Sequence, residues 1–548
     1  DRFFTNRLTL IEWQNVAKEL QQSLTDSVIE IATRQMPPEI FAISGNDIIA
    51  KLKSRRSHLV EYATKYYLFL SKNVDIVGSK GREYFEVKQV NDKETEVNIF
   101  DLKEDENRKQ PFYNRKFNAN ETNEIRLYGL SGKDIYSVDA EVNNGIKIRI
   151  IGGDDIDSIK LAGNGKKVHV YDDPEKNIIQ PKSKARLHLS SDSMVHDFDY
   201  DAFIPGKRGI KPAIGYNSED RLYVGIGYGW LHQSFRKKPF ASLQNISVNY
   251  SISQKAFSTT YTGLFPKVIA NWNLLLKGNY DAVRWTQFFG LGNETLNQTD
   301  DIDYYRMRSA QWLGSIGLNH LVGKSNITVS GFYNSLNILN DTNRFLAKQY
   351  LPFNPEKFKT NSFVGGMFNY NITSVNDSIV PEKGIVFSAN AGYTHNIKDA
   401  GRSFAHFGGD VQMYIPLVPK ISLAISTGAA TVTGTPEFYQ YATIGGANSL
   451  RGYRTGRFSG KTAFYNSNEI RFITNIRSYY MNGKIGLLAF FDDGRVWLPS
   501  EKSDTWHTNY GGGILLVPFK LIYVDVTYGI SKEDKLIQLR VRSKMGLK

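Results

Sequence analysis

Residue patterns that could support catalysis occur only as fragments in this chain of 548 residues. Gly129-Leu130-Ser131-Gly132 lacks the final spacing of the Gly-x-Ser-x-Gly elbow that exposes a nucleophilic serine. Gly445-Gly446 is a loop feature, because no Lys-Ser/Thr pair follows it as in a phosphate-binding loop. The nine His residues are scattered without a His-Glu-x-x-His pair, and zero Cys excludes a thiol nucleophile or a Cys-ligated metal. These residues therefore predict neither an enzyme nor a cofactor, although a domain that preceded Asp1 could be an enzyme.

One acidic turn could hold a metal ion. Gly152-Gly153-Asp154-Asp155 loosely resembles calcium-binding Gly/Asp repeats, in which carboxylate oxygens ligate Ca²⁺. The candidate ligands are Asp154, Asp155 and Asp157. Ordinary Gly/Asp turn chemistry is the alternative interpretation.

The composition indicates which elements would position a site. The chain has 31 Tyr, 32 Phe and 7 Trp beside 46 Gly, a combination that soluble enzymes rarely show and that membrane β-barrels use in their aromatic girdles and curved strands. The mean hydropathy of -0.37 and the lack of a run of about 18–20 apolar residues exclude a helical membrane protein. A transmembrane barrel has no such run, because its strands alternate between lipid-facing and lumen-facing residues.

The formal net charge of +13 does not indicate a nucleic-acid partner. The densest basic cluster, at Lys51, Lys53, Arg55 and Arg56, lies in a helical pattern and is interpreted as a solvated helix face. We therefore expect no binding to nucleic acid.

The N-terminal part is predicted to be α+β. Apolar residues recur with helical spacing over about residues 10–35, two prolines end this pattern, and a second helix is expected over about residues 47–71. Short β segments follow, and we expect residues 1–120 to form this region. Because the chain begins at Asp1 with neither Met nor an apolar leader, we expect a processed or truncated product.

A weak repeat follows the α+β region. Ile125-Arg126-Leu127-Tyr128-Gly129 recurs as Ile148-Arg149-Ile150-Ile151-Gly152, and Val168-His169-Val170-Tyr171 comes one further period later. A period of about 20–23 residues with Gly/Asp turns predicts a small β-solenoid-like stack of parallel rungs. We place this stack, which connects to the next region, at residues 121–182.

Residues 183–548 alternate with a period of two. In the last such segment, Ile537, Leu539 and Val541 alternate with polar or charged residues. The segments run for about 10–15 residues, close to the length of a tilted membrane strand, and an even number of them fits a closed barrel. Sixteen strands are expected, centred near Ala213, Ile226, Ser247, Thr260, Leu274, Leu313, Val329, Phe368, Ala389, Asp410, Ile425, Ile470, Leu488, Gly513, Asp525 and Leu539. The predicted fold is thus mainly β, a sixteen-stranded antiparallel transmembrane barrel after an α+β periplasmic domain with a small β-solenoid-like stack.

Three ordered motifs occur over residues 440–500. The first, Ile444–Arg454, contains Arg451-Gly452-Tyr453 and lies between the eleventh and twelfth expected strands. The second, Tyr465–Phe472, contains Glu469 and lies on the twelfth, and the third, Phe490–Trp497, contains Asp492 and Gly494 and lies on the thirteenth. On this strand pattern they resemble the bacterial surface antigen barrel superfamily, which includes the BamA/TamA-type outer-membrane assembly factors and the two-partner secretion transporters. The resemblance covers about residues 183–548.

The resemblance implies roles for these residues. In the family, the Arg-Gly-aromatic tip lies on the sixth extracellular loop, which folds back into the lumen and meets an acidic residue of the Phe-x-Asp-x-Gly motif. It implies that Arg451 contacts Asp492, that Gly452 permits a turn and that Tyr453 packs on the wall, while Gly494 completes the wall motif. Glu469 is a possible second acceptor. The alternative is that Arg451 and Asp492 only brace the barrel.

The resemblance also implies that the working element is the seam between the first and last strands, where exposed backbone groups could template a client strand. We place it near Tyr216 on one side and near Leu539 and Val541 on the other. The first strand is expected to be short and interrupted by Pro212 and Gly215, since proline lacks an N–H.

The N-terminal region departs from the housekeeping members, whose repeated βααββ domains cannot be read in residues 1–180. Some relatives, notably in Bacteroidota, carry other N-terminal extensions, including metallophosphoesterase domains, and the chain resembles such an unusual member without the metal-binding motifs of that enzyme.

The first hypothesis is an outer-membrane barrel of a Gram-negative bacterium, with a periplasmic N-terminal region, that inserts or exports client proteins without ATP. The alternatives are a dedicated secretion or lipid-transport pore and a structural surface barrel with an occluded lumen. Expected partners are outer-membrane lipid including lipopolysaccharide, client proteins, and periplasmic or lipoprotein accessory subunits.

Overall fold

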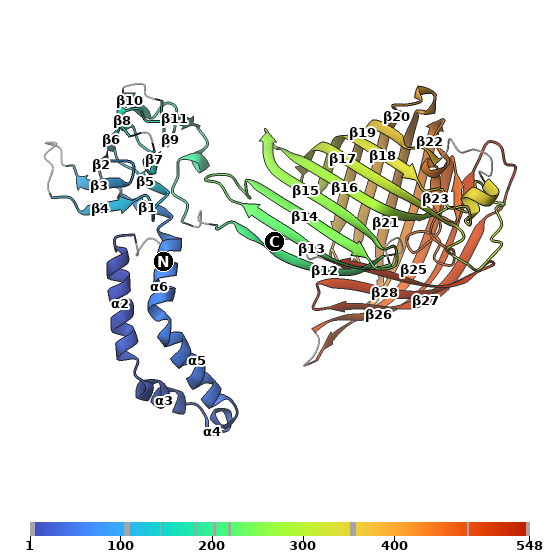
Figure 1. The fold of residues 1–548 in the computed structure, drawn as a ribbon, viewed down its shortest axis with the longest axis horizontal. Helices are drawn as coiled ribbons and strands as arrows, with labels where there is room; N and C mark the ends of the chain where they lie inside the picture. Colours follow the sequence, from blue (N-terminus) through green and yellow to red (C-terminus); the bar gives the residue numbers. More distant parts are fainter. Residues whose placement is uncertain are drawn as a thin grey trace. The chain divides into compact units, whose positions relative to one another are not determined.

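The computed structural model describes residues 6–102, 110–142, 144–180, 184–200, 204–217, 221–350, 358–478 and 482–543. The chain divides into two compact units, Asp1–Phe203 and Ile204–Lys548, which are considered separately (Figure 1).

The first unit begins with a chain of short helices in place of the two expected long ones. Thr25 ends the first helical pattern because its side-chain hydroxyl accepts the Val28 N–H at 3.3 Å and caps a new helix. Trp13 packs edge-on against Tyr66, with ring centroids 5.9 Å apart, and so joins the first helix to the last. The helices are α2 (Leu10–Ser23), α3 (Asp26–Arg34), α4 (Pro38–Ile40), the π-helical η1 (Phe41–Gly45), α5 (Asn46–Ser57) and α6 (Leu59–Leu70). No helix in the described part of the chain is long and apolar enough to cross a membrane.

Two packed sheets follow the helices in the first unit, and a 3-10 turn, η2 (Ser193–Val195), comes after them. The five-stranded sheet is wholly parallel, and the six-stranded sheet is parallel except for the β2–β3 and β3–β4 pairs. In sheet order, the first contains β1 (Asn73–Val77), β5 (Glu124–Leu130), β7 (Lys147–Gly153), β9 (Val168–Asp172) and β11 (Arg186–Leu189). The second contains β10 (Asn177–Gln180), β8 (Asp157–Gly163), β6 (Ile135–Ala140), β2 (Glu83–Gln89), β3 (Glu94–Asp101) and β4 (Tyr113–Asn118).

The repeat in the sequence corresponds to successive rungs of this stack. Ile125 pairs with Ile148, and Ile148 pairs with Val168, and all three side chains are buried between the sheets. Strands β1 and β2 precede residue 120 but pair with β5 and β6 of the repeat. The sheets therefore continue across the expected boundary at residue 120, and the compact unit extends to Phe203 rather than to 182.

Acidic side chains line the interior of the stack. Asp134 Oδ1 accepts the backbone N–H of Glu83 at 2.7 Å, and Asp157 Oδ1 accepts that of Asp134 at 2.9 Å, so each carboxyl joins neighbouring rungs. Burial raises the pKa of Asp134 to about 9 and that of Asp157 to about 8, because the charged form is disfavoured away from water. These carboxyls are accordingly protonated in the folded unit at neutral pH.

The second unit is one antiparallel sheet of sixteen strands curled into a barrel (Figure 1). The strands, in sheet order, are β12 (Lys207–Asn217), β13 (Arg221–His232), β14 (Ser242–Ser251), β15 (Ala256–Ile269), β16 (Trp272–Gln287), β17 (Arg306–Val322), β18 (Ser325–Ile338), β19 (Asn361–Val375), β20 (Gly384–Asn396), β21 (Phe404–Val418), β22 (Ile421–Gly434), β25 (Thr462–Arg477), β26 (Asn482–Trp497), β27 (His507–Pro518), β28 (Ile522–Ser531) and β29 (Lys535–Ser543). Each of the sixteen expected centres lies in its own strand, so the predicted fold class is confirmed.

The alternation assigns the two faces of each barrel strand. On β26, Leu487 and Phe491 are exposed on the outer face, whereas Leu488, Phe490 and Asp492 are buried on the inner face. The period of two in the sequence therefore corresponds to an apolar exterior and a filled interior.

The two edges of the sheet are β12 and β29, and no backbone ladder joins them within the described residues. The ladder between β12 and β13 is continuous from Lys207 to Asn217 and includes Pro212 paired with Ile226. The first strand is therefore eleven residues long and not interrupted at Pro212, contrary to the expectation. A proline is tolerated in an edge strand, where its missing N–H need not weaken the one existing ladder.

Candidate functional site

The loop of residues 435–461, between β22 and β25, folds into the barrel. It contains the 3-10 turn η6 (Phe438–Gln440) and a hairpin of β23 (Ala442–Ile444) and β24 (Phe458–Gly460). Gly445 and Gly446 follow β23 with φ of 115° and 92°, backbone conformations that favour glycine. This double glycine turns the chain so that the hairpin tip, residues 445–457, projects toward the inner wall.

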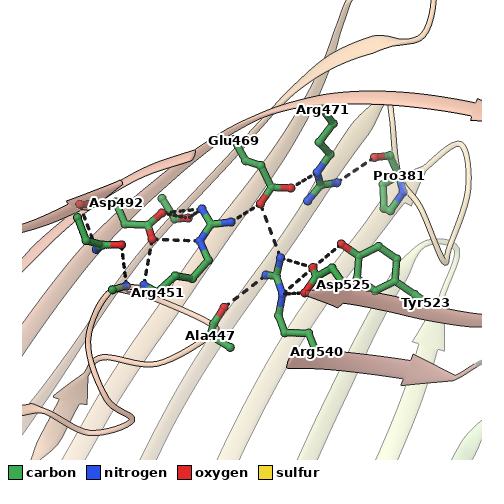
Figure 2. Close-up of polar contacts among 12 residues, drawn as sticks. Pro381, Ala447, Arg451, Glu469, Arg471, Asp492, Tyr523, Asp525 and Arg540 are labelled. Carbon is green, nitrogen blue, oxygen red and sulfur yellow. Dashed lines mark hydrogen bonds and ion pairs between the residues drawn. The ribbon is translucent and has the colours of Figure 1, made fainter. Parts of the chain in front are cut away.

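Arg451 at this tip is 1% exposed and lies against Asp492, which is 0% exposed (Figure 2). Its Nε and Nη2 donate to the two carboxylate oxygens at 3.0 and 2.6 Å, and its backbone N–H donates to Oδ2 at 3.0 Å. The guanidinium also lies over the ring of Phe490, with Cζ 3.6 Å from the centroid. Because a bidentate guanidinium–carboxylate pair is directional, these contacts fix both the position and the orientation of the loop tip.

The Glu469 carboxylate, on β25, lies close to three arginine side chains (Figure 2). It forms ion pairs with Arg451 of the loop and with Arg471 of its own strand. The Nη2 atom of Arg540, on the last strand, lies 3.6 Å from its Oε2. A buried carboxylate is costly unless it is paired, so these contacts offset the desolvation of Glu469.

Asp525 on β28 completes the network (Figure 2). Arg540 Nε donates to its two carboxylate oxygens at 3.0 and 2.8 Å, and the Tyr523 hydroxyl donates to Oδ2 at 2.6 Å. Arg540 Nη1 also donates to the carbonyl oxygen of Ala447, in the loop, at 3.4 Å. The network contains three guanidinium groups and three carboxylates, so it is neutral, and it joins the loop to β25, β26, β28 and β29.

Gly452 and Tyr453 seat the loop beside Arg451. The Gly452 N–H donates to Asn509 Oδ1 at 2.8 Å, and a Cβ at this position would lie 2.6 Å from the Cβ of Asn509. Only glycine therefore allows the loop to approach β27 this closely. The Tyr453 ring is buried edge-on against Phe458 and His507, at centroid distances of 5.3 and 5.8 Å.

Two further arginines of the tip hold the loops at the outer rim. Arg457 donates from Nε and Nη2 to Glu533 at 2.7 and 2.9 Å, and from Nη1 to Thr295 Oγ1 at 2.6 Å. Arg454 Nε donates to Asp534 Oδ2 at 2.9 Å. The loop thus binds the connection between β28 and β29 through ion pairs, and it binds the connection between β16 and β17 through a hydrogen bond to Thr295.

Cavities border the loop within the described part of the barrel. A cavity of about 380 Å³ lies between the loop and β16–β18, with Trp285, Arg306 and Phe438 in its wall. A second, of about 270 Å³, borders Glu469 and Arg540. The loop therefore narrows the lumen without filling it.

The other residues singled out in the sequence have distinct surroundings. Gly494 lies on β26, where a Cβ would be 2.7 Å from the Phe464 carbonyl oxygen. Leu539 and Val541 are exposed on the outer face of β29. Tyr216 pairs with Leu222 through the backbone, and its side chain lies outside the described residues.

The structure does not bring the three calcium candidates together as ligands. Asp154 and Asp155 are exposed, and Asp155 Oδ2 accepts the Gly132 N–H at 2.8 Å. Asp157 instead points into the stack, where it binds the backbone of Asp134. No group of three or more acidic or His side chains in the described part of the chain is arranged to hold a metal ion. Turn and rung chemistry accounts for these carboxylates.

The sequence interpretation assigned no role at the site to Arg471 and Asp525, which belong to the network, or to Phe490 and Asn509, which contact the loop tip. A signal for two of them was present: Arg471 is two residues after Glu469, and Asp525 is two residues after Tyr523, so each pair shares one strand face. Charged residues at such inward positions mark the wall of a filled barrel.

Residues 244–548, more than half of the chain, match the family described as the Omp85 superfamily domain. BamA from Haemophilus ducreyi lacking POTRA domains 1–3 is a similar solved structure, with 15% identity, a TM-score of 0.48, and coverage of 62% of this chain and 70% of that one. CdiB from Escherichia coli has 15% identity, a TM-score of 0.38, and coverage of 61% of this chain and 62% of that one. CdiB from Acinetobacter baumannii has 12% identity, a TM-score of 0.37, and coverage of 61% and 59%.

Proposed function

Because the chain belongs to the Omp85 superfamily, we propose that it inserts client proteins into the outer membrane, or exports them across it, without ATP. The protein is an outer-membrane barrel of the assembly and translocation superfamily, and its N-terminal region is periplasmic. Its clients are outer-membrane or secreted proteins. Periplasmic or lipoprotein accessory subunits deliver them, and the apolar exterior of the barrel contacts outer-membrane lipid, including lipopolysaccharide.

The observation that carries this proposal is the contact of the lumenal loop with the last strand. Arg540 on β29 donates to Ala447 of the loop, and Gln538 Nε2 donates to the Tyr453 carbonyl oxygen at 3.4 Å. The position of β29 is therefore tied to the loop that Arg451 fixes on Asp492. A change in the loop would be transmitted to the edge of the sheet.

The open edge of the sheet supplies the hydrogen-bonding groups for the proposed addition of a client strand. Strands β12 and β29 share no ladder in the described residues, so each has backbone N–H and C=O groups without a strand partner on one side. Such edges template the addition of another strand. A client strand would pair at the seam, using main-chain hydrogen bonds in place of an energy-rich cofactor.

Replacement of Arg451 by alanine tests the role of the loop. We expect client proteins to be lost from the outer membrane while the variant barrel is still present there, because the loop loses its bidentate anchor. The matched control is Lys461→Ala, which removes a partly exposed cation of the same loop that donates to the Gly434 carbonyl oxygen. Normal client levels in the Arg451→Ala strain would refute the proposed mechanism.

A second experiment tests the seam. The chain has no native cysteine, so a panel of cysteine pairs, one on β12 and one on β29, can be screened for a disulfide without background. We expect the oxidised pair to block client assembly and its reduction to restore it. Full function with the seam closed would exclude lateral opening.

Depletion of the protein separates insertion from dedicated export. Loss of many barrel proteins from the outer membrane is the expected result for an insertase. Loss of one secreted product alone would instead indicate a dedicated transporter.

A further inference from the structure

The connection between β19 and β20, residues 376–383, forms a second insertion into the barrel. Antiparallel order places it at the end where β12 starts, opposite to the loop of residues 435–461. Val380 at its centre is 0% exposed, although short barrel connections ordinarily lie at the rim. Residues 376–383, here named the inner turn, therefore approach the lumen from the periplasmic end.

The inner turn covers an apolar patch on the barrel wall. Val380 and the partly buried Ile379 pack in one cluster with side chains of β25–β28. The patch consists of Ile473, Leu488, Phe490, Leu515, Val517 and Tyr523. A barrel interior is ordinarily polar, so a continuous apolar patch on the inner wall needs a partner that excludes water.

The inner turn is held at both ends by charge. Lys484 on β26 lies 3.3 Å from Asp377 Oδ2 and 2.8 Å from Glu382 Oε1, the acidic residues that flank the apolar pair. Arg471 Nη1 donates to the Pro381 carbonyl oxygen at 3.5 Å (Figure 2). The wall thus presents an apolar surface bordered by cations, which is complementary to an apolar segment with acidic neighbours.

The inner turn also has a defined shape of its own. Asp377 Oδ1 accepts the N–H groups of Ile379 and Val380 at 2.9 and 3.3 Å, and Asn376 Oδ1 accepts those of Glu382 and Lys383, both at 3.0 Å. The shape of the turn is therefore held by its own hydrogen bonds as well as by the wall. A separate peptide segment could present the same residues to the patch.

We propose that the patch is a binding site for client segments, and that the inner turn occupies it until a client arrives. The segment that fits has two adjacent branched apolar residues flanked by carboxylates, the chemistry of Asp377, Ile379, Val380 and Glu382. This inference rests on the proposed function, because only a client chain would enter the lumen from the periplasmic end. Phe490 belongs to the patch and also lies under the Arg451 guanidinium, so the site adjoins the loop anchor.

The register allows the inner turn to be removed cleanly. Val375 of β19 and Gly384 of β20 are directly paired, so residues 376–383 can be replaced by Asn-Gly, a two-residue connection suited to a hairpin. The probe is a labelled peptide with the sequence Asn-Asp-Ser-Ile-Val-Pro-Glu-Lys, taken from the inner turn. A matched control peptide carries Ser in place of Ile379 and Val380.

Binding is measured by fluorescence anisotropy on the full-length protein and the shortened variant, both in lipid nanodiscs. We expect the peptide to bind the shortened variant at least tenfold more tightly than the full-length protein, and the control peptide to bind neither. Lys484→Ala in the shortened variant should weaken binding several-fold, because the flanking carboxylates lose their cation. Equal binding to both proteins, or no binding to the folded shortened variant, would overturn the proposal.

A second variant retains the whole connection. Ile379→Ser with Val380→Ser should release the inner turn, so that the wild-type peptide binds this variant and the single-channel conductance rises above that of the native protein. If the shortened barrel does not fold, an unchanged conductance and no peptide binding in this variant overturn the proposal. The peptide assay does not involve Arg451, so its failure and the failure of client assembly in the Arg451→Ala strain are separate results.

Discussion

In the parallel stack, Asp134 and Asp157 are buried against backbone N–H groups, whereas in the barrel Glu469 and Asp492 are buried against arginines. The first pair is protonated at neutral pH, because no cation offsets the loss of hydration. The second pair is matched by guanidinium groups that come from the loop as well as from the wall. Neutral carboxyls thus join neighbouring rungs of one sheet through backbone N–H groups, whereas paired charges hold a loop against the barrel wall.

The largest expected effect is the response of the stack to pH. The folded-state pKa values of Asp134 and Asp157, about 9 and about 8, lie above the unfolded value near 3.9, so the folded stack binds more protons at pH 5–7. The free energy of unfolding of the first unit therefore falls as the pH rises, by about 5 kcal/mol between pH 5 and pH 7 for the two carboxyls together. Proteolysis of the full-length protein in urea, with fragments identified by mass, measures this change. A stack that is equally resistant at both pH values would contradict the prediction. Asp134→Asn with Asp157→Asn should remove most of the response and leave the part due to Asp172, whose pKa burial raises to about 7.

The next effect is that of Asp492→Asn in the barrel. Loss of this charge leaves Arg451 buried without its bidentate partner, which should lower the free energy of unfolding by about 3–5 kcal/mol. Urea unfolding in lipid vesicles measures the change. Asp493→Asn is the matched control, because the Asp493 carboxylate accepts one bond from Asn466 at 3.1 Å and lies on the other strand face, so a loss below about 1 kcal/mol is expected. Similar losses of unfolding free energy for Asp492→Asn and Asp493→Asn would show that the buried ion pair stabilises the barrel no more than an ordinary polar contact.

The same substitution should have the opposite sign in the stack. At pH 8, Asp134→Asn replaces a carboxyl that must remain protonated with a neutral group of the same shape, and we expect a gain of about 1–3 kcal/mol in unfolding free energy. Asp155→Asn, at an exposed carboxylate of the neighbouring turn, serves as the control and should change little. Urea-dependent proteolysis of the first unit at pH 8 provides the measurement. A destabilised Asp134→Asn stack would show that the carboxyl is ionised there.

The smallest effect is expected at the inner turn, whose ion pairs are partly exposed. Lys484→Ala should lower the unfolding free energy of the barrel by about 0.5–1 kcal/mol, because water replaces much of the lost interaction with Asp377 and Glu382. The change should shrink further at high salt, whereas the loss for Asp492→Asn should not. Unfolding in urea at two ionic strengths measures how the loss of each variant depends on salt. An equal dependence for Lys484→Ala and Asp492→Asn would contradict the expectation that burial protects the Asp492 ion pair from screening.

Much of the barrel could be predicted from the sequence, because strand alternation is a local property. Each strand reveals its two faces through neighbouring residues, as Leu487 and Leu488 on β26 illustrate. The helices were less predictable, since the break at Thr25 depends on a cap that competes with continuous apolar spacing. Part of the candidate site could also be predicted, because the motif that contains Arg451 and the motif that contains Asp492 are each a short continuous run of residues.

The remaining contacts could not be predicted, because their partners are far apart in the chain. Arg540 reaches Ala447 and Glu469, and Val380 reaches a patch on strands that begin about 80 residues later, a separation over which local patterns carry no information. By itself, the sequence determined the class of fold, the number and faces of the strands, and the motif at the loop tip, since these depend on periodicity and short spacing. Only the tertiary structure decided which buried charges are paired, which are protonated, and that a turn from the periplasmic end covers the apolar wall, since closing the sheet brings distant strands within reach of one another.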